Sequence, residues 1–316
     1  MSDIKLFRYA SECATELAGK SVAVEKTLQK LIESQMETFL GVRFLATEYS
    51  TGNRHRGRID SLGLDENGCP VIVEYKRHSN ENVINQGLYY LDWLLDHKAD
   101  FRLLVMDTLG KDEAGKIEWG GTRLLCIAAD FTRYDEHAVA QINRNIELIR
   151  YKTFADDLLL LELVNGASAA STQSTIEVED VPVSEKPART PAASTLAMKT
   201  HADQVATASP ELLALYEETR GFILAQGDDI IEKQLKLYVA FRRLKNFVCM
   251  SLISKVDPHV FLTLKLDPST VQLEEGFSRD VSKIGHWGTG DLELTLRAPD
   301  DFEKARALIE RAYTEN

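Results

Sequence analysis

The stretch GRIDSLGLDENGCPVIVEYK, residues 57–76, decides the fold of the first half of this chain. It predicts two short strands around a turn, with Asp60 on the first strand and Glu74 and Lys76 on the second. Successive side chains of a strand point to opposite faces, so Glu74 and Lys76 share one face and Tyr75 takes the other. The length of the turn then decides whether Asp60 joins them.

Two turns are compatible with the residues between these strands. A three-residue loop, Glu66–Gly68, pairs Asp65 with Cys69. Counted outward, that register puts Asp60 directly opposite Glu74 on the same face. The last loop position is a glycine, as the positive φ of this loop type requires. A two-residue Asn-Gly turn would slip the register by one residue and separate the carboxylates. We favour the longer loop because it gathers two acids and a lysine on one small surface.

Two carboxylates beside a lysine suit metal-assisted hydrolysis of a phosphodiester. Carboxylate oxygens are hard ligands for Mg²⁺ or Mn²⁺, and the bound cation polarises the phosphoryl oxygen and lowers the pKa of a bound water. A lysine beside the metal orients that water or stabilises the charge that develops on the phosphate. An E-x-K triplet alone is common, and the alternative is an exposed hairpin face with ordinary salt-bridge partners.

The elements around the hairpin carry a family resemblance. G-R-I-D, a turn, V-I-V-E-Y-K-R and then a helix resemble the PD-(D/E)xK nuclease superfamily, and most closely its NucS-like endonuclease branch. Residues 20–100 resemble it closely and residues 100–165 loosely, with Ile59 in place of the proline of the nominal motif. The implied fold is an α/β N-terminal domain of the restriction-endonuclease type, a mixed sheet flanked by helices.

The resemblance also implies roles for single residues. It assigns Asp60 and Glu74 to a divalent cation, Mg²⁺ or Mn²⁺, and Lys76 to the attacking water. Glu25, on a helix predicted at 22–40, matches an acid that often completes the site. Its alternative role is that of a solvated acid in the first turn, favoured by the helix dipole.

A second helix, predicted at 80–97, carries Gln86 and Tyr90 four residues apart and so on one face. The resemblance implies that such a pair supports the site and holds the nucleic-acid backbone. For Tyr90 the alternative is a plain core aromatic.

Arginines gather beside the proposed site. Arg54, Arg56 and Arg58 lie in the loop TGNRHRGR, and Arg77 follows the second strand. A guanidinium group matches phosphate geometry, so we expect these arginines to contact nucleic acid. The alternative is a solvated loop that balances nearby acids, and we expect Glu48 to pair with one of its arginines.

Composition bounds the class of protein. The chain has 316 residues, 44% of them hydrophobic and 27% charged, as in ordinary globular domains. No apolar run of about 18 residues predicts a membrane span. Four scattered cysteines without C-x-x-C spacing argue against a zinc site and favour a cytoplasmic location. The net charge of −12 argues against duplex binding by bulk electrostatics, so any nucleic-acid contact must come from local clusters and the metal.

Three segments are expected along the chain. Residues 1–165 form the nuclease-like domain, in which 4–9 predict a strand followed by a short helix or turn, and the apolar runs 101–107 and 122–130 predict buried strands. Residues 166–208, rich in Ala, Ser, Thr and Pro, predict a flexible linker. Residues 209–316 predict a smaller α+β domain of unknown role, which resembles an uncharacterised domain found beside such nucleases.

The sequence therefore predicts a metal-dependent nuclease, with residues 209–316 as a recognition or oligomerisation domain. The resemblance alone implies DNA rather than RNA as its substrate. This domain would contact a protein partner, nucleic acid or a second copy of the chain. Two alternatives stay open. One is a non-catalytic nucleic-acid- or protein-binding module on a nuclease fold, and the other is a regulatory or assembly protein.

Overall fold

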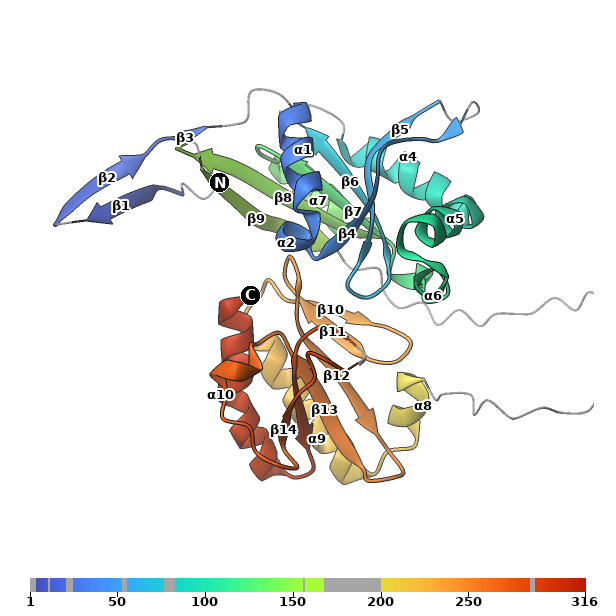
Figure 1. Ribbon diagram of the computed structural model, residues 1–316, viewed down its shortest axis with the longest axis vertical. Helices are drawn as coiled ribbons and strands as arrows, with labels where there is room; N and C mark the ends of the chain where they lie inside the picture. The colour runs from blue at the N-terminus through green and yellow to red at the C-terminus, as the bar shows by residue number, and fades with distance from the viewer. Residues whose placement is uncertain are drawn as a thin grey trace, which may run out of the picture.

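A computed structural model describes residues 4–10, 12–20, 25–52, 56–76, 83–155, 157–167, 200–284 and 288–316. The chain forms an N-terminal unit, residues 4–167, and a C-terminal unit, residues 200–316 (Figure 1). The strands of the N-terminal unit are β1 (Leu6–Ala10), β2 (Cys13–Leu17), β3 (Gly19–Lys20), β4 (Val42–Ser50), β5 (Arg58–Asp65), β6 (Pro70–Lys76), β7 (Arg123–Ala128), β8 (Asn145–Phe154) and β9 (Leu158–Ala167). Its helices are α1 (Glu25–Ser34), α2 (Met36–Leu40), α4 (Val83–Asp96), α5 (Lys98–Leu109), α6 (Lys111–Ala114) and α7 (Arg133–Ala140).

A seven-stranded mixed sheet forms the centre of the N-terminal unit. Its strand order is β3-β8-β7-β6-β5-β4, with β9 paired to β8. The strands β6, β7 and β8 run parallel, whereas β4, β5 and β9 pair antiparallel with their neighbours. Helix α1 buries Leu28 and Ile32 against one face, and α4 buries Leu91 and Leu94 against the other. The expected mixed sheet with helices on both faces is therefore present.

The segment 101–107 is not a buried strand as predicted. It lies within α5, where Phe101 and Val105 are buried while Leu103 is 53% exposed. Phe101 and Val105 are four residues apart and so share one helical face, but a short apolar run does not distinguish a strand from a helix by pattern alone. The other run, 122–130, does contain the expected buried strand, β7.

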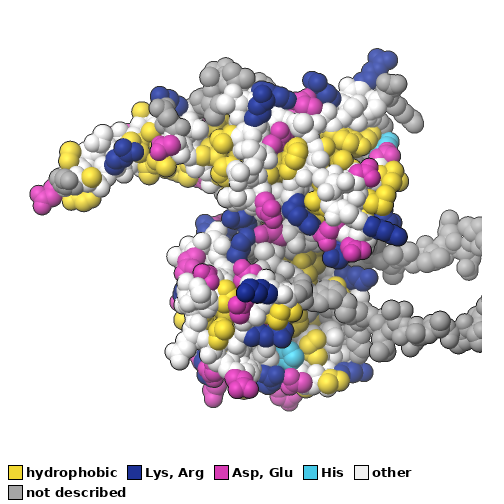
Figure 2. All heavy atoms as spheres, in the orientation of Figure 1, with side chains coloured by type: hydrophobic (Ala, Val, Ile, Leu, Met, Phe, Trp, Pro, Cys, Tyr) yellow, Lys and Arg dark blue, Asp and Glu magenta, His cyan; other side chains and the backbone are white. Residues whose placement is uncertain are grey.

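The first residues form an arm. We call residues 4–17, with the hairpin of β1 and β2, the N-terminal arm; it forms a two-stranded sheet of its own and projects from the unit (Figure 1). Instead of the short helix or turn expected after residue 9, a second strand pairs back on the first, from Leu6↔Leu17 to Ala10↔Cys13. Figure 2 shows hydrophobic side chains along this arm.

The C-terminal unit is an α+β fold. Its strands β10 (Ile231–Gln234), β11 (Val239–Arg242), β12 (Asn246–Ile253), β13 (His259–Leu264), β15 (Leu292–Leu296) and β14 (Ser278–Asp280) form an antiparallel sheet in this order. Helices α9 (Pro210–Leu224) and α10 (Pro299–Glu315) pack on it. As predicted, Ser209 caps α9 by accepting the Leu212 N–H at 3.2 Å, and Pro210 occupies its first position.

The expected linker, 166–208, is too long at both ends. Strand β9 continues to Ala167, and α8 (His201–Ala206) begins with a capping box between Thr200 and Asp203. His201 is buried, and its ring nitrogen lies 3.1 Å from the hydroxyl of Tyr216. The composition of residues 166–208 did not indicate α8, because small and polar residues dominate that segment. Residues 168–199 lie outside the described part of the chain.

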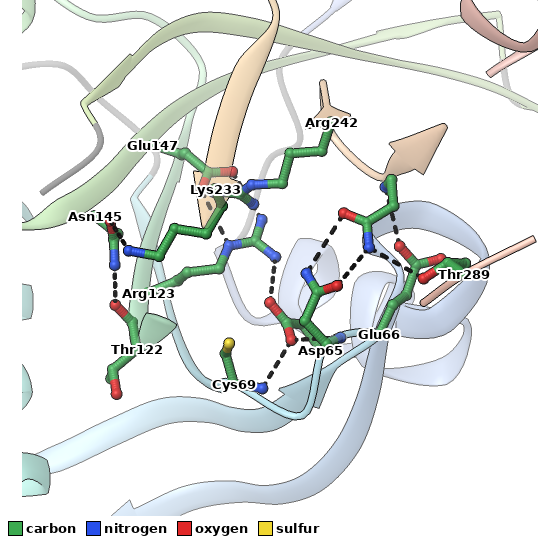
Figure 3. A network of polar contacts seen from close by, with 12 residues as sticks. Asp65, Glu66, Cys69, Thr122, Arg123, Asn145, Glu147, Lys233, Arg242 and Thr289 are labelled. Atoms are coloured by element: carbon green, nitrogen blue, oxygen red, sulfur yellow. Dashed lines mark hydrogen bonds and ion pairs between the residues drawn. The ribbon is translucent and has the colours of Figure 1, made fainter. Parts of the chain in front are cut away.

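A buried charge network joins the two units (Figure 3). Arg123 donates to Glu147 at 2.8 and 3.0 Å and to Asp65 at 3.0 Å. Arg242 of the C-terminal unit also donates to Glu147. Burial alone would raise the pKa of Glu147, but the two guanidinium groups hold it below its usual value. Glu147 is therefore ionised and shared between a residue of its own unit and one of the other.

The turn of the β5–β6 hairpin makes a second set of contacts with the C-terminal unit. Glu66 accepts the Asn246 N–H at 3.0 Å and the Lys265 ammonium at 2.7 Å. Asn67 accepts the Tyr238 hydroxyl at 3.0 Å and the Asn246 amide at 2.7 Å. The C-terminal unit is thus bonded to the edge of the sheet where β7 and β8 begin and where β5 turns into β6. The opposite edge, where β6 and β7 end, carries the predicted site. No helix in the described part of the chain is long and apolar enough to cross a membrane.

Replacing Glu147 by alanine should lower the unfolding free energy by about 3–5 kcal/mol, because two buried guanidinium groups lose their shared acceptor. Urea denaturation at neutral pH measures this cost. Glu303→Ala is the control, since Glu303 makes an exposed pair with Arg306 at 3.1 Å and should change stability by about 0–1 kcal/mol. Equal costs for the two variants would contradict the role of the network.

Candidate active site

The β5–β6 hairpin has the three-residue loop, the longer of the two turns that the sequence allowed. Asp65 donates its N–H to the carbonyl of Cys69 at 2.9 Å, and Gly68 has a φ of +75°. The ladder continues from Leu64↔Pro70 to Ser61↔Val73. This register was predicted from the sequence and is confirmed, and its next step places Asp60 opposite Glu74.

The two carboxylates lie where the regular ladder ends. Beyond Ser61↔Val73, the Asp60 N–H donates to Oε1 of Glu74 at 3.2 Å, and the Tyr75 N–H donates to Oδ2 of Asp60 at 3.0 Å. Each carboxylate thus accepts a hydrogen bond from a backbone N–H of the facing strand, which fixes both groups in place. We call this end of the hairpin, with the facing carboxylates of Asp60 and Glu74, the fork. Glu74 is fully buried, and its Oε2 has no hydrogen-bond partner among the described residues. A buried polar atom without a partner is costly, so this oxygen is suited to a ligand.

Lys76 and Glu25 complete a cluster of three acids and one cation. The ammonium of Lys76 lies 3.4 Å from Oε1 of Glu25, the first residue of α1. Partial burial alone would lower the pKa of Lys76, but the carboxylates of Glu25, Asp60 and Glu74 outweigh it and hold the pKa above its usual value. Lys76 therefore keeps its charge at neutral pH.

The two acids at the fork hold protons more tightly than free carboxylates. Burial raises the pKa of Glu74 to about 9, and the nearby charge of Asp60 adds to this effect. Burial also raises the pKa of Asp60, although the hydrogen bond from the Tyr75 N–H and the charge of Lys76 oppose it. Without a cation the fork thus carries less negative charge at neutral pH than two ionised carboxylates would.

A polar network behind the fork was missed by the sequence analysis. Gln29 is buried, and its amide donates to the carbonyl of Asp60 at 2.7 Å and to Glu33 at 2.9 Å. Glu33 also accepts the hydroxyl of Ser61 at 2.6 Å. Glu25, Gln29 and Glu33 follow one another at intervals of four residues, so one face of α1 holds the hairpin. That spacing was visible in the sequence and could have revealed the network.

Gln86 and Tyr90 lie at the base of the arginine loop rather than on the carboxylates. The Gln86 amide donates to the hydroxyl of Tyr90 at 3.2 Å, and that hydroxyl accepts the Arg58 N–H at 3.3 Å. A Cβ on Gly57 would lie 2.5 Å from the Tyr90 ring, so the close approach needs glycine there. Within the described residues, neither Gln86 nor Tyr90 bonds to Asp60 or Glu74. Tyr90 is buried, so it is both a core aromatic and an anchor for the loop.

The arginines are only partly described. Arg58 pairs with Glu48 at 3.1 Å, as predicted for one arginine of the loop, and Lys26 also contacts Glu48. Arg56 is exposed and has a φ of +48°. Arg54 and Arg77 lie outside the described residues. Contact of these arginines with nucleic acid remains a prediction.

The donor set of the fork suits some metal ions better than others. Nowhere in the described part of the chain do three or more His, Cys, Asp or Glu side chains converge to hold a metal ion. Mg²⁺ keeps several waters and takes one or two carboxylates, whereas zinc takes three or four protein ligands. Asp60 and Glu74, with the unpartnered Oε2, fit Mg²⁺ or Mn²⁺ as a two-carboxylate set.

Comparisons with known proteins leave the activity open. Residues 201–316 match a family described as a domain of unknown function, DUF5655. An uncharacterised protein of Haemophilus influenzae is 26% identical over 314 residues, which cover 98% of this chain and 99% of that protein. The C-terminal unit is thus similar to a family without assigned function, and the sequence similarity to the bacterial protein extends over almost the whole chain.

One solved structure shows a weak likeness. It is the structure of an EndoMS–dsDNA2 complex, with a TM-score of 0.25 and 19% sequence identity. The match covers 42% of this chain and 47% of the EndoMS chain, so this protein spans about half of that chain. At this TM-score the likeness is too low to support a conclusion about either the fold or the activity.

The Glu74→Gln variant should stabilise the metal-free protein at neutral and alkaline pH. The folded pKa of about 9 lies above the unfolded value, so the contribution of Glu74 is fully present below pH ~4.5 and is lost as the pH rises through about 9. Glutamine matches the neutral carboxyl and cannot ionise. Thermal unfolding in a chelator should show almost no gain near pH 4.5 and a gain on the order of 5 kcal/mol near pH 8, because about 1.4 kcal/mol is lost for each pH unit between the two pKa values. A gain independent of pH would contradict the assigned ionisation.

Proposed function

We propose that this protein is a metal-dependent nuclease that hydrolyses phosphodiester bonds at the fork of the β5–β6 hairpin. The observation that carries the proposal is the convergence of Asp60, Glu74 and Lys76, with Oε2 of Glu74 buried and without a partner. The restriction-endonuclease type of fold is part of the proposal and rests on the motif together with the mixed sheet that positions it.

Each residue has a chemical role in this proposal. Asp60 and Glu74 would hold Mg²⁺ or Mn²⁺, which when bound polarises the phosphoryl oxygen and supplies hydroxide near neutral pH. Lys76 stays protonated, so it acts as a fixed positive charge that stabilises the developing phosphate charge rather than as a general base. Glu25 anchors the Lys76 ammonium, and Gln29 fixes the backbone of Asp60.

The substrate is proposed to be DNA, following the resemblance of the hairpin motif to the nuclease superfamily. The C-terminal unit lies against the opposite edge of the sheet and is proposed to serve recognition of a partner or assembly with a second copy. A cytoplasmic location fits a chain whose cysteines are all free thiols.

A second candidate is a nucleic-acid- or protein-binding module that has kept the nuclease fold without turnover. The specific observation that favours it is that only two carboxylates face the fork, and no third His, Cys, Asp or Glu joins them at metal-binding geometry in the described residues. Metal-dependent binding of DNA by wild-type protein without any cleavage would decide for this module.

The nuclease proposal predicts Mg²⁺- or Mn²⁺-dependent cleavage that depends on the fork. Asp60→Asn, Glu74→Gln and Lys76→Met should each lower the cleavage rate by about 100-fold or more, because each removes a charge at the reacting phosphate. The measurement is cleavage of labelled single-stranded, duplex and branched DNA, with RNA as a comparison.

Matched controls are available elsewhere on the chain. Glu303→Gln and Lys255→Met remove exposed charges of the C-terminal unit and should cleave like the wild type. Cleavage that survives both Asp60→Asn and Glu74→Gln would assign the activity to a contaminant and remove the enzyme proposal.

Cation binding should release protons. Glu74, with a pKa of about 9, is mainly protonated at neutral pH, and a metal ligand must be ionised. At pH 7 each bound Mn²⁺ should therefore release close to one proton, and the affinity should rise with pH up to about 9. Calorimetric titration in two buffers of different ionisation enthalpy measures this release, and Glu74→Gln should abolish it. Binding heats that do not depend on the buffer would contradict the prediction.

A further inference from the structure

The N-terminal arm exposes apolar and aromatic side chains that no other described residue of the chain covers. All five residues of β1 are exposed, and Phe7 and Tyr9 are 52% and 73% exposed. The arm forms a sheet of two strands only, and an isolated hairpin is marginally stable in water. Exposed apolar patches of this kind mark binding surfaces.

The two aromatic rings have a regular placement. Phe7 and Tyr9 are two positions apart on one strand, so both point to the same face, opposite Glu16 and Ala14 respectively. Their backbone positions are about 6.7 Å apart along the strand. Stacked nucleotides rise by about 3.4 Å per step, so one flat base fits between two rings at this spacing. The small side chain of Ala14 leaves the ring of Tyr9 uncovered.

Positive charge lies at the base of the arm rather than on the arm itself. Lys5 and Arg8 are exposed on the arm, but Lys5 pairs with Glu16 at 3.2 Å and Glu12 is a second exposed acid there. Lys20 follows on β3, at the base. A pocket of about 240 Å³ at the base is lined by residues that include Lys20, Arg150 and Lys152. Asp130 and Glu162 hold Arg150 at 2.9 and 2.8 Å. With Lys20 and Lys152, the lining has three cations against two acids and so one net positive charge, in a protein whose net charge is −12.

The arm and the fork lie along the same edge of the sheet. Lys76 at the end of β6 is in register with Ala128 of β7, which is in register with Arg150 of β8. Arg150 is thus two strands from Lys76, roughly 10 Å away. Lys20 pairs with Thr153, three residues further along β8. Along this edge of the sheet the pocket therefore lies between the fork and the arm.

We propose that the N-terminal arm binds unpaired nucleobases of a single-stranded segment next to the scissile phosphate, with Phe7 and Tyr9 stacking on the bases. This inference rests on the proposed function, because it names the substrate of the same site as nucleic acid with an unpaired stretch. A second copy of this chain is the competing occupant of the rings. Nucleic acid is favoured because the two rings are spaced to take one base between them and because the pocket at the base of the arm carries positive charge on the side of the fork.

The test separates stacking from plain apolar packing. Each ring is replaced by an aromatic or a non-aromatic side chain, Phe7→Tyr against Phe7→Leu and Tyr9→Phe against Tyr9→Leu, in a full-length Asp60→Asn background that prevents cleavage. Fluorescence anisotropy measures binding to an oligothymidylate and to an abasic oligonucleotide of the same length. Leu103→Ser, which removes a side chain with 53% exposure on α5, is the control.

We expect each leucine variant to weaken oligothymidylate binding by about 5- to 100-fold, while the aromatic variants and Leu103→Ser bind like the parent. Binding to the abasic oligonucleotide should be weaker and unaffected by the leucine variants. A photo-crosslink from an iodouracil-containing oligonucleotide should map to Phe7 or Tyr9. The arm is exposed, so these variants should keep the Tm of the parent, which separates lost binding from lost folding.

The proposal is overturned if the leucine variants bind oligothymidylate like the parent. It is also overturned if they convert a wild-type dimer into a monomer without a change in that binding, which would identify a second copy as the occupant. Failure of the nuclease proposal gives a different pattern, with binding through the arm but no cleavage by the wild type. Cleavage by wild type together with unaltered binding by the leucine variants would remove the arm proposal alone.

Discussion

The register of the β5–β6 hairpin determines the geometry at both ends of that hairpin. One end holds the facing pair Asp60 and Glu74, and the other is the turn that contacts the C-terminal unit. A three-residue turn ending in Gly68 sets that register, and the ladder then brings Asp60 opposite Glu74. A slip of one residue would move Asp60 to the other face and also displace Glu66 and Asn67 from their partners in the C-terminal unit. The same backbone geometry therefore fixes the fork and the contact between the units. The C-terminal unit, which bonds to the turn, stabilises the register that the fork requires.

The C-terminal unit contacts one edge of the sheet, and the fork and the arm lie at the opposite edge. Arg123 and Asn145 begin β7 and β8, and both contact residues that bond to the C-terminal unit or belong to it. The edge where β6 and β7 end has Lys76 and Glu25 beside the fork and the arm at its far side. Parallel strands conventionally present ligand sites at their carboxyl ends, and here the C-terminal unit contacts the other edge. For the proposed nuclease, this arrangement favours a role of the C-terminal unit in holding the N-terminal unit or in assembly rather than in contacting the reacting phosphate.

Local rules predicted the parts of this structure that depend on neighbouring residues. Strand alternation and the glycine of the turn predicted the fork, and Ser209 with Pro210 predicted the start of α9. The strand predicted at 101–107 was wrong because a short apolar run is compatible with both a helix and a strand. The helix or turn predicted after residue 9 was wrong because we recognised no strand pattern in the residues that form β2. The bond between Glu147 and Arg242 joins residues 95 positions apart, and no spacing rule pairs charges at such a distance. Of the candidate site, the fork followed from the predicted register, and the resemblance implied that Glu25 lies beside it. The contact of Glu25 with Lys76 and the buried support from Gln29 and Glu33 needed the helix to be placed on the hairpin.

The charge of the fork also sets an order of events for the proposed reaction. Three acids surround Lys76, and the whole chain is negative, so a phosphate approaching the fork without a cation meets net repulsion. A dication held in place of the Glu74 proton would add one net positive charge and so offset the negative charge of the fork, with the unpartnered oxygen of Glu74 as one of its ligands. Lysines along the edge can hold the nucleic acid before that happens, because their attraction does not depend on the metal. In this proposal nucleic acid can therefore bind at the arm and the pocket without the dication, whereas entry of the scissile phosphate into the fork requires it.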